Sequence, residues 1–438
     1  MKVVSFAVRS EALAVLFAIC FCLFQSAFAQ KPAPSAAVPS RPPDEIRQLW
    51  AANVTAMLAK PIPSSSADAY YAGEQLMVPL HAAFQRKDAA WEQEFADHFL
   101  RLSQTHVPLT DVTLSRLQYL YLASQFMVLA KNSGHPDLVP KGMPDFIVGE
   151  VRKVWYDEPA PQYAHAPFKG ARARILFKLE NKNLGKNFYR AILDAEFFMF
   201  AIAGDIRNYY GFERAAGETS INDILAIALK TCQQEIVHTP SGGWVLQPGV
   251  FSDHPDFQFA GNPDLRPGLR PAPVQSIGWD SSHFARWALF IRSLMTAYPA
   301  DSREYSYYSQ LERELNTQFF DKVVVPPSPE FPCYRMNNFM DGSNGVYRYG
   351  YKSMGENNGY GPYGNSGALL TGWWGFLESE QSHAMYHKMA DQFPWPERCV
   401  DLYLGPTFEG VRRAKAELDP NTPVLKYRYL LTRLASEL

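Results

Sequence analysis

The residues best suited to chemistry gather in one stretch of the chain, residues 242–286. It holds two histidines, His254 and His283, together with acidic, amide and tryptophan side chains. Glycine and proline interrupt the stretch, and a long irregular segment in a compact domain is either disordered or functional. Its aromatic residues argue against disorder. We therefore expect an ordered loop whose side chains furnish a carbohydrate-processing cleft.

These side chains fit the removal of a proton next to a carboxylate, as in a lyase that acts on a uronic-acid polymer. The reaction needs a base that takes the proton and groups that neutralise the carboxylate. His254 and His283 could take the proton or position the substrate. Tyr360 or Tyr363 could return a proton to the leaving oxygen. The catalytic candidates are therefore His254, His283 and Tyr363.

The binding candidates come from the same stretch and from a second one, residues 355–365. The second stretch combines glycines, which let backbone approach a ligand, with rings that can stack on it. Asparagines could bind the substrate carboxylate, and arginines could pair with an anionic polymer. The substrate-binding candidates are Trp244, Asp253, Asn262, Trp279, Asp280, Arg286, Asn358 and Tyr360.

Structural interpretations compete with these assignments. Either histidine could be a hydrogen-bonded structural residue. His283 and Arg286 are three residues apart at the start of an expected helix, so both can lie on one face near its positive end, which favours an anion. Arg286 could instead pair with Asp280 as a capping salt bridge. Both alternatives stay open at the level of sequence.

A glycoside hydrolase would need two carboxylates across the bond that it cleaves, about 5 to 10 Å apart. Asp194 and Glu196 stand out because they interrupt an apolar helix. Positions two apart on a helix do not share a face, so these two cannot act as a pair from one side. We expect an internal salt bridge for whichever of them is buried.

Apolar residues recur at helical spacing through most of the chain, whereas the alternation typical of strands is rare. Asp280 and the two serines after it offer N-cap oxygens to one of the helices. Residues 114–129 and 192–206 are apolar nearly all round, as in helices buried on several sides. The expected helices span 44–59, 70–104, 111–131, 186–210, 220–237, 281–298, 302–322, 366–379 and the tail from 423.

Buried inner helices and amphipathic outer ones predict an all-α fold, an (α/α) toroid or barrel of helical hairpins. Loops rich in glycine and aromatic residues lead into a helix at residues 278–284 and again at 355–370. If the inner helices all begin at one rim, these loops collect there. We therefore expect the two loops to form one cleft.

The architecture and loop chemistry resemble the (α/α) toroid superfamily of polysaccharide lyases and six-hairpin glycosidases. Residues 249–257, GVFSDHPDF, with 260–262, AGN, are similar to the Gly-aromatic, Asp, His, aromatic-Gly loop of the chondroitin and hyaluronan lyase group. The rest of the chain matches only in helical pattern. The resemblance implies a catalytic set of Asn, His, Tyr and usually Arg, and spacing does not fix the equivalent Tyr here.

The first residues predict export. Lys2 and Arg9 precede a short apolar run, residues 12–24, and residues 26–29, SAFA, form an A-x-A-like cleavage site. The apolar run is too short to span a bilayer comfortably, so we expect no membrane span in the mature chain and a periplasmic or extracellular location. The predicted organisation is a signal peptide at 1–29, a Pro/Ala/Ser-rich linker at 30–43 and a single domain at 44–438.

The cysteine content, the absence of metal and phosphate motifs and the net charge limit which cofactors and partners the sequence predicts. After cleavage the chain keeps Cys232, Cys333 and Cys399, which allow at most one intramolecular disulfide. Zinc, EF-hand and phosphate-loop patterns do not occur, so we expect no dedicated metal site and no cofactor. A formal net charge of −2 gives no sequence-wide electrostatic case for nucleic acid.

The sequence thus predicts an exported carbohydrate-active enzyme that cleaves a polysaccharide or oligosaccharide. A lyase on a uronic-acid-containing glycan is placed first because of the Arg, Asn, His and Tyr content of the loops. The alternatives are a glycoside hydrolase on the same scaffold and a non-catalytic carbohydrate-binding protein of the cell envelope.

The signal sequence can be tested directly. Because cleavage is expected after Ala29, mass spectrometry of the exported protein should find a mature N-terminus at or near Gln30. Recovery of intact Met1 in the soluble secreted fraction would contradict the prediction.

Overall fold

The computed structural model describes residues 43–104, 109–215, 217–407 and 411–438. The predicted signal peptide and all of the predicted linker except Pro43 lie outside these residues. The described residues belong to one unit of tertiary contacts.

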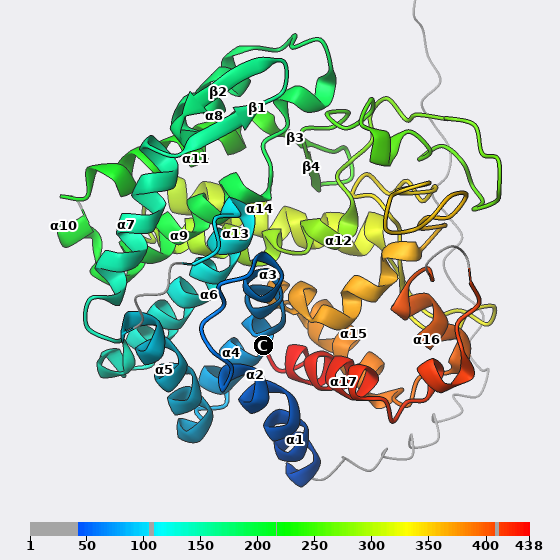
Figure 1. Ribbon diagram of the computed structural model, residues 1–438, viewed down its shortest axis with the longest axis horizontal. Helices are drawn as coiled ribbons and strands as arrows, with labels where there is room; N and C mark the ends of the chain where they lie inside the picture. Colours follow the sequence, from blue (N-terminus) through cyan, green and yellow to red (C-terminus); the bar gives the residue numbers. More distant parts are fainter. Residues whose placement is uncertain (1–42, 105–108, 216, 408–410) are drawn as a thin grey trace, which may run out of the picture. The chain divides into compact units, whose positions relative to one another are not determined.

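Helices dominate this unit, which confirms the prediction of a mainly helical chain. Figure 1 shows them with only short strands between. The α-helices are α1 (Pro43–Trp50), α2 (Ala56–Leu58), α3 (Ser66–Gln75), α4 (Met77–Gln85), α5 (Ala89–Gln104), α6 (Thr113–Asn132), α7 (Met143–Tyr156), α8 (Gly170–Glu180), α9 (Asp194–Tyr210), α10 (Phe212–Ala215), α11 (Thr219–Glu235), α12 (Ser281–Phe284), α13 (Trp287–Thr296), α14 (Arg303–Gln318), α15 (Glu380–Asp391), α16 (Glu397–Leu404) and α17 (Pro423–Ala435).

The strands form three antiparallel pairs in the described part of the chain. The sheets have two strands each and do not build the core. Pairing joins Pro159 to Lys169, Ile236 to Leu246, and Val324 to Met336. The strands are β1 (Pro159–Gln162), β2 (His165–Lys169), β3 (Ile236–His238), β4 (Trp244–Leu246), β5 (Val324–Val325) and β6 (Arg335–Met336).

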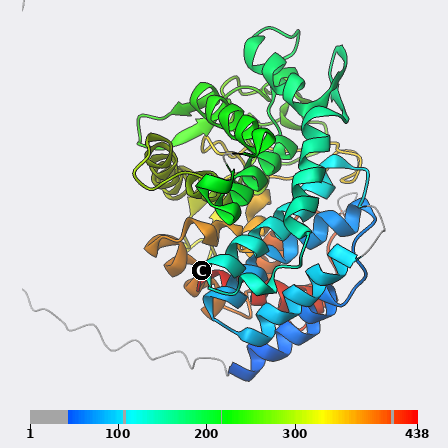
Figure 2. The ribbon, with the colours of Figure 1, turned by 90° about the vertical axis from the view of Figure 1, so that its left-hand side faces the viewer.

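The core is centred on α6 and α9, which pack against each other, and α9 packs in turn on α13. Every residue of α6 from Ser115 to Val128 is buried, as is every residue of α9 from Glu196 to Ile206. This agrees with the near-continuous apolar character of both segments. Figure 2 shows the chain turned by 90°, with the N-terminal helices, in blue and cyan, gathered together.

Polar groups inside this core pair with one another across three helices. Asp205 of α9 accepts hydrogen bonds from Ser124 Oγ (2.6 Å) and Gln125 Nε2 (2.8 Å) of α6. Gln125 Nε2 also donates to Ser293 Oγ of α13 at 2.9 Å. Burial raises the pKa of Asp205 to about 7, against these hydrogen bonds. The three helices therefore share one buried polar junction.

Several predicted helices are divided. Residues 70–104 form α3, α4 and α5, and residues 281–298 form α12 and α13. Residues 366–379 were expected to be one helix, but they form two 3₁₀ segments, η6 (Gly364–Thr371) and η7 (Trp373–Leu377). Gly372 between them has φ +82°, a conformation that ends regular helix. η6 packs on α16 and α17, and η7 packs on α13 and α17.

Other helices were not expected from the sequence. α7, α8, α15 and α16 were missed, and the segment 236–238 at the end of an expected helix is strand β3. α7 begins with Pro144 at its second residue, and Pro396 precedes α16. Proline is favoured in the first turn of a helix, so these residues mark helix starts rather than breaks.

One disulfide joins distant segments. Cys333 and Cys399 are bonded, with Cα atoms 6.1 Å apart, and Cys232 is a buried free thiol. The bond connects the segment before β6 to helix α16. In the described residues, no helix is both long enough and apolar enough to cross a bilayer.

The contact between α9 and α13 depends on a glycine. A Cβ added at Gly204 would lie 2.3 Å from the carbonyl oxygen of Ser293, whereas one added at Gly149 of α7 would meet nothing within 4 Å. Gly204→Ala should therefore separate the two helices and lower the free energy of unfolding by about 1–3 kcal/mol.

Gly149→Ala is the matched control, since the same change in open space should be neutral or stabilise the helix by up to about 1 kcal/mol. Chemical denaturation of both variants measures the difference. Equal stability of the two variants would show that the α9–α13 contact tolerates a side chain.

Candidate active site

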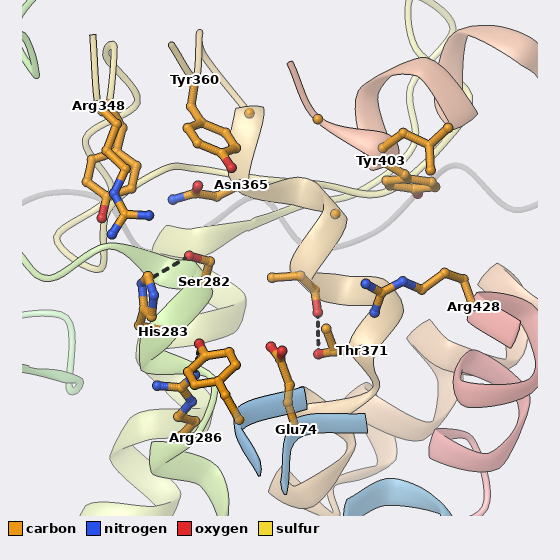
Figure 3. Close-up of a pocket in the computed structure, with 17 residues that line it drawn as sticks. Glu74, Ser282, His283, Arg286, Arg348, Tyr360, Asn365, Thr371, Tyr403 and Arg428 are labelled. Carbon is orange, nitrogen blue, oxygen red and sulfur yellow. Dashed lines mark hydrogen bonds between the residues drawn. The ribbon is translucent and has the colours of Figure 1, made fainter. Parts of the chain in front are cut away.

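A cavity of about 220 Å³ opens where the first turn of α12 meets α3, η6, α16 and α17. Figure 3 shows its polar side chains converging on one space from these elements and from the segment 347–360. The lining residues are Tyr70, Glu74, Ser282, His283, Arg286, Tyr347, Arg348, Tyr360, Gly364, Asn365, Gly367, Ala368, Thr371, Tyr403, Leu404, Gly405 and Arg428.

His283 is fixed by the N-cap of its own helix. Asp280 accepts hydrogen bonds from the backbone N–H of His283 (3.1 Å) and from the hydroxyl of Ser282 (2.5 Å). The same carboxylate oxygen lies 2.7 Å from His283 Nδ1. A proton on Nδ1 therefore points to Asp280, and Nε2 is the nitrogen left for another partner.

The charges of this pair support each other. Burial opposes ionisation of Asp280, but the charge and hydrogen bond of His283, followed by the charge of Arg348, hold its pKa well below the ordinary value. For His283, burial acts to lower the pKa, and the charge and hydrogen bond of Asp280 outweigh it and raise the pKa. The His283 side chain keeps 27% of its surface exposed, so the ring remains accessible from the cavity.

Arg286 is buried beside this pair. Its Nη1 lies 2.5 Å from the carboxylate of Asp194, and its Nη2 donates to the Tyr70 hydroxyl at 2.5 Å. Its salt bridge is thus to Asp194 at the start of α9 rather than to Asp280. Glu196, two residues after Asp194, is fully buried and pairs with Arg174 (2.8 Å) and Lys178 (3.3 Å), as expected for a carboxylate inside an apolar helix.

The segment 347–360 forms another wall. Tyr347 and Tyr360 exchange backbone hydrogen bonds of 2.8 Å in each direction. Arg348, between them in the chain, places Nε 3.0 Å from the carboxylate of Asp256. Burial raises the pKa of the Tyr360 hydroxyl, against the effect of Arg348, so this hydroxyl stays protonated at neutral pH and can donate.

A buried asparagine, Asn338, holds the cavity-lining residue Asn365 in place. Asn338 is fully buried and donates from Nδ2 to the carbonyls of Gly345 and Gly361, both at 2.8 Å. Its Oδ1 accepts the backbone N–H of Asn365 at 2.9 Å. Asn365 Nδ2 donates back to the Asn338 carbonyl at 3.0 Å. These bonds fix Asn365, which lines the cavity, without using a cavity-facing partner.

Four of the eleven residues proposed from the sequence meet at this site. His283, Arg286 and Tyr360 line the cavity, and Asp280 holds His283 from behind. Residues of both loop stretches, 242–286 and 355–365, thus contribute to one cavity. Tyr70, Glu74, Tyr403 and Arg428 also line the cavity. These four residues come from ordinary helices far away in the chain and carry no loop signature, so the sequence does not predict them.

The other polar candidates hold the loops themselves. Asp253 accepts the backbone N–H groups of Asn187 (2.8 Å) and Phe188 (3.3 Å). Asn262 Nδ2 donates to the carbonyls of Phe259 and Arg270, and Asn358 Nδ2 donates to those of Met354 and Thr407. Asp253, Asn262 and Asn358 do not line the cavity.

The remaining candidates pack in or near the core. Trp244 is fully buried and donates from Nε1 to the Leu311 carbonyl at 2.9 Å, and Trp279 is buried among aromatic rings. His254 Nδ1 accepts a hydrogen bond from the backbone N–H of Asp256 at 3.1 Å, and the His254 ring packs edge-to-face against the ring of Phe188. Tyr363 packs under the guanidinium of Arg335. None of these four residues lines the cavity.

In the part of the chain that the structure describes, no three His, Cys, Asp or Glu side chains are grouped as metal ligands would be. Comparison of the chain with protein-family models, with curated proteins and with solved structures finds no match. The cavity is therefore the feature of the described chain that bears on function.

The His283–Asp280 pair predicts a pH dependence. The raised pKa of His283 stabilises the fold below the unfolded value of about 6.5, and this contribution is lost as pH rises through the folded pKa. The lowered pKa of Asp280 contributes above about 4 and is lost as pH falls through its folded pKa. The pair should therefore stabilise the protein most between these limits.

Asp280→Asn keeps an N-cap oxygen and removes the charge, so the pKa of His283 should fall. NMR titration of the histidine ring protons in both proteins measures this shift. Identical titration of His283 in the variant would show that Asp280 does not control it.

Proposed function

We propose that the chain is an exported enzyme that cleaves a uronic-acid-containing polysaccharide by β-elimination. The observation that carries the proposal is His283, held by a buried carboxylate and open to a cavity lined by three arginines and one carboxylate. Such a lining suits an anionic substrate, and an oriented imidazole suits proton transfer.

Each step of the elimination has a candidate group. His283 Nε2 takes the proton from the carbon next to the substrate carboxylate, and the electrons of that C–H bond form a carbon–carbon double bond. The bond from the neighbouring carbon to the glycosidic oxygen breaks, and the Tyr360 hydroxyl gives that oxygen a proton. Arg348 stabilises the negative charge that develops on the carboxylate side. The products are one chain with a new reducing end and one chain with an unsaturated uronate at its non-reducing end.

Hydrolysis is the second candidate reaction. It is favoured by the position of the Glu74 carboxylate in the cavity. Its carboxylate lines the cavity and, among the described residues, accepts no hydrogen bond and forms no ion pair. A hydrolase needs a second carboxylate facing the same bond. Glu74 is the only acidic residue of the lining that the structure describes, and Asp280 is already bound to His283. We therefore place elimination first.

The fold and the location are parts of the same proposal. The buried central parts of α6 and α9, which pack among other helices, support an (α/α) toroid of helical hairpins. The signal-like N-terminus supports export. The Cys333–Cys399 disulfide fits an oxidising compartment, where such bonds persist.

Incubation of the purified protein with a panel of uronate polymers tests the reaction. Elimination should increase ultraviolet absorbance in step with new chain ends, whereas hydrolysis would give reducing ends without that absorbance. His283→Ala should lower the rate by at least about 10², the loss typical of a proton-transfer group.

His238→Ala is the matched control, because His238 pairs with Glu314 at 2.8 Å and lies outside the cavity. It should keep wild-type turnover, and melting temperatures should show that both variants are folded. A His283→Ala protein that is destabilised yet fully active per folded molecule would remove His283 from the site. Binding of a glycan without cleavage of any polymer would favour the non-catalytic alternative.

A further inference from the structure

The side of the cavity away from His283 has its own polar groups. Figure 3 shows Tyr403 and Arg428 across the cavity from His283 and Arg348, with Glu74 and Thr371 between. These residues come from α16, α17, α3 and η6. The elimination chemistry assigned to His283 and Tyr360 does not use them.

Arg428 differs from the other two arginines of the lining. Arg286 is neutralised by Asp194 and Arg348 by Asp256. Within the described residues, the Arg428 guanidinium has no hydrogen bond and no ion pair, although it is only partly exposed. An arginine presents several donors that fit a carboxylate or sulfate, and an unpaired one has all of them available for a ligand.

The backbone around Arg428 is held in place from outside the cavity. The neighbouring Tyr427 donates its hydroxyl to the Gln75 carbonyl of α3 at 2.7 Å. Trp373 Nε1 donates to the Glu74 carbonyl at 3.0 Å, and the Tyr403 hydroxyl donates to the Tyr334 carbonyl at 2.9 Å. This wall is therefore fixed before a ligand arrives, which lowers the entropic cost of binding.

We propose that Arg428 and Tyr403 form a second sugar subsite, in which Arg428 binds an acidic group on the unit next to the one that is cleaved. The inference rests on the proposed function, since it takes the cleaved unit to lie at His283. Tyr403 lines this part of the cavity, and Glu74 and Thr371, which line it too, face the sugar hydroxyls. The preferred substrate then carries carboxylate or sulfate groups on adjacent units.

Binding and turnover of three oligosaccharides test the subsite. One carries uronate on every unit, one alternates uronate with a neutral sugar, and one alternates uronate with a sulfated sugar. Arg428→Ala should raise KM for the first at least about tenfold with little change in kcat, because a charge-assisted hydrogen bond is lost. KM for the neutral alternating substrate should not change. The sulfated one shows whether sulfate substitutes for carboxylate.

Arg433→Ala is the matched control, because Arg433 lies on the same helix and pairs with Glu437 at 3.4 Å outside the cavity. Calorimetry with His283→Ala, alone and combined with Arg428→Ala, measures affinity without cleavage. Cleavage by the wild type with affinity independent of Arg428 would overturn the subsite and leave the lyase proposal intact. Affinity that depends on Arg428 without any elimination would overturn the lyase proposal and retain the anion subsite. Failure to bind any of the three would reject both.

Discussion

The close contact of α9 with α13 at Gly204 determines how the cavity is built. Because no side chain separates Gly204 from the Ser293 carbonyl, the two helices lie side by side, and near their starts the ring centroids of Phe197 and Trp287 are 4.4 Å apart. Asp194, the first residue of α9, then reaches Arg286, which directly precedes α13. That ion pair positions the turn that carries His283. The packing of α9 on α13 in the core thus fixes the positions of Arg286 and His283 at the cavity.

Three basic side chains on the same side of the cavity share a common arrangement. His283, Arg286 and Arg348 each face the cavity, and each has its own carboxylate behind it, from Asp280, Asp194 and Asp256 respectively. Buried charge is tolerated where it is paired and hydrogen-bonded. The pairing keeps donors in fixed positions and leaves little uncompensated charge. Selectivity in this half of the cavity would then arise from geometry more than from net attraction.

The region around His283 is predictable from the sequence because capping and helical periodicity are local signals. Asp280 at the N-cap, His283 in the first turn and the buried character of α6 and α9 all follow from neighbouring residues. Chemical type alone could not separate ligand-facing from loop-holding side chains: Asn262, Asn358 and His254 bind backbone instead. Glu74 and Arg428 come together only through packing of helices about 350 residues apart, which no local pattern encodes.

The disulfide carries a consequence for how this protein is handled. Cys399 lies in α16, and the residues that end α16, from Tyr403 to Gly405, form part of the cavity wall. The bond ties that wall to the segment before β6, so a chain produced in a reducing cytoplasm would keep the first turn that carries His283 while losing a tether on the opposite wall. Protein made in the cytoplasm and protein made by secretion would therefore differ in whether Cys333 and Cys399 are bonded. Material intended for activity measurements therefore has to be folded where thiols are oxidised.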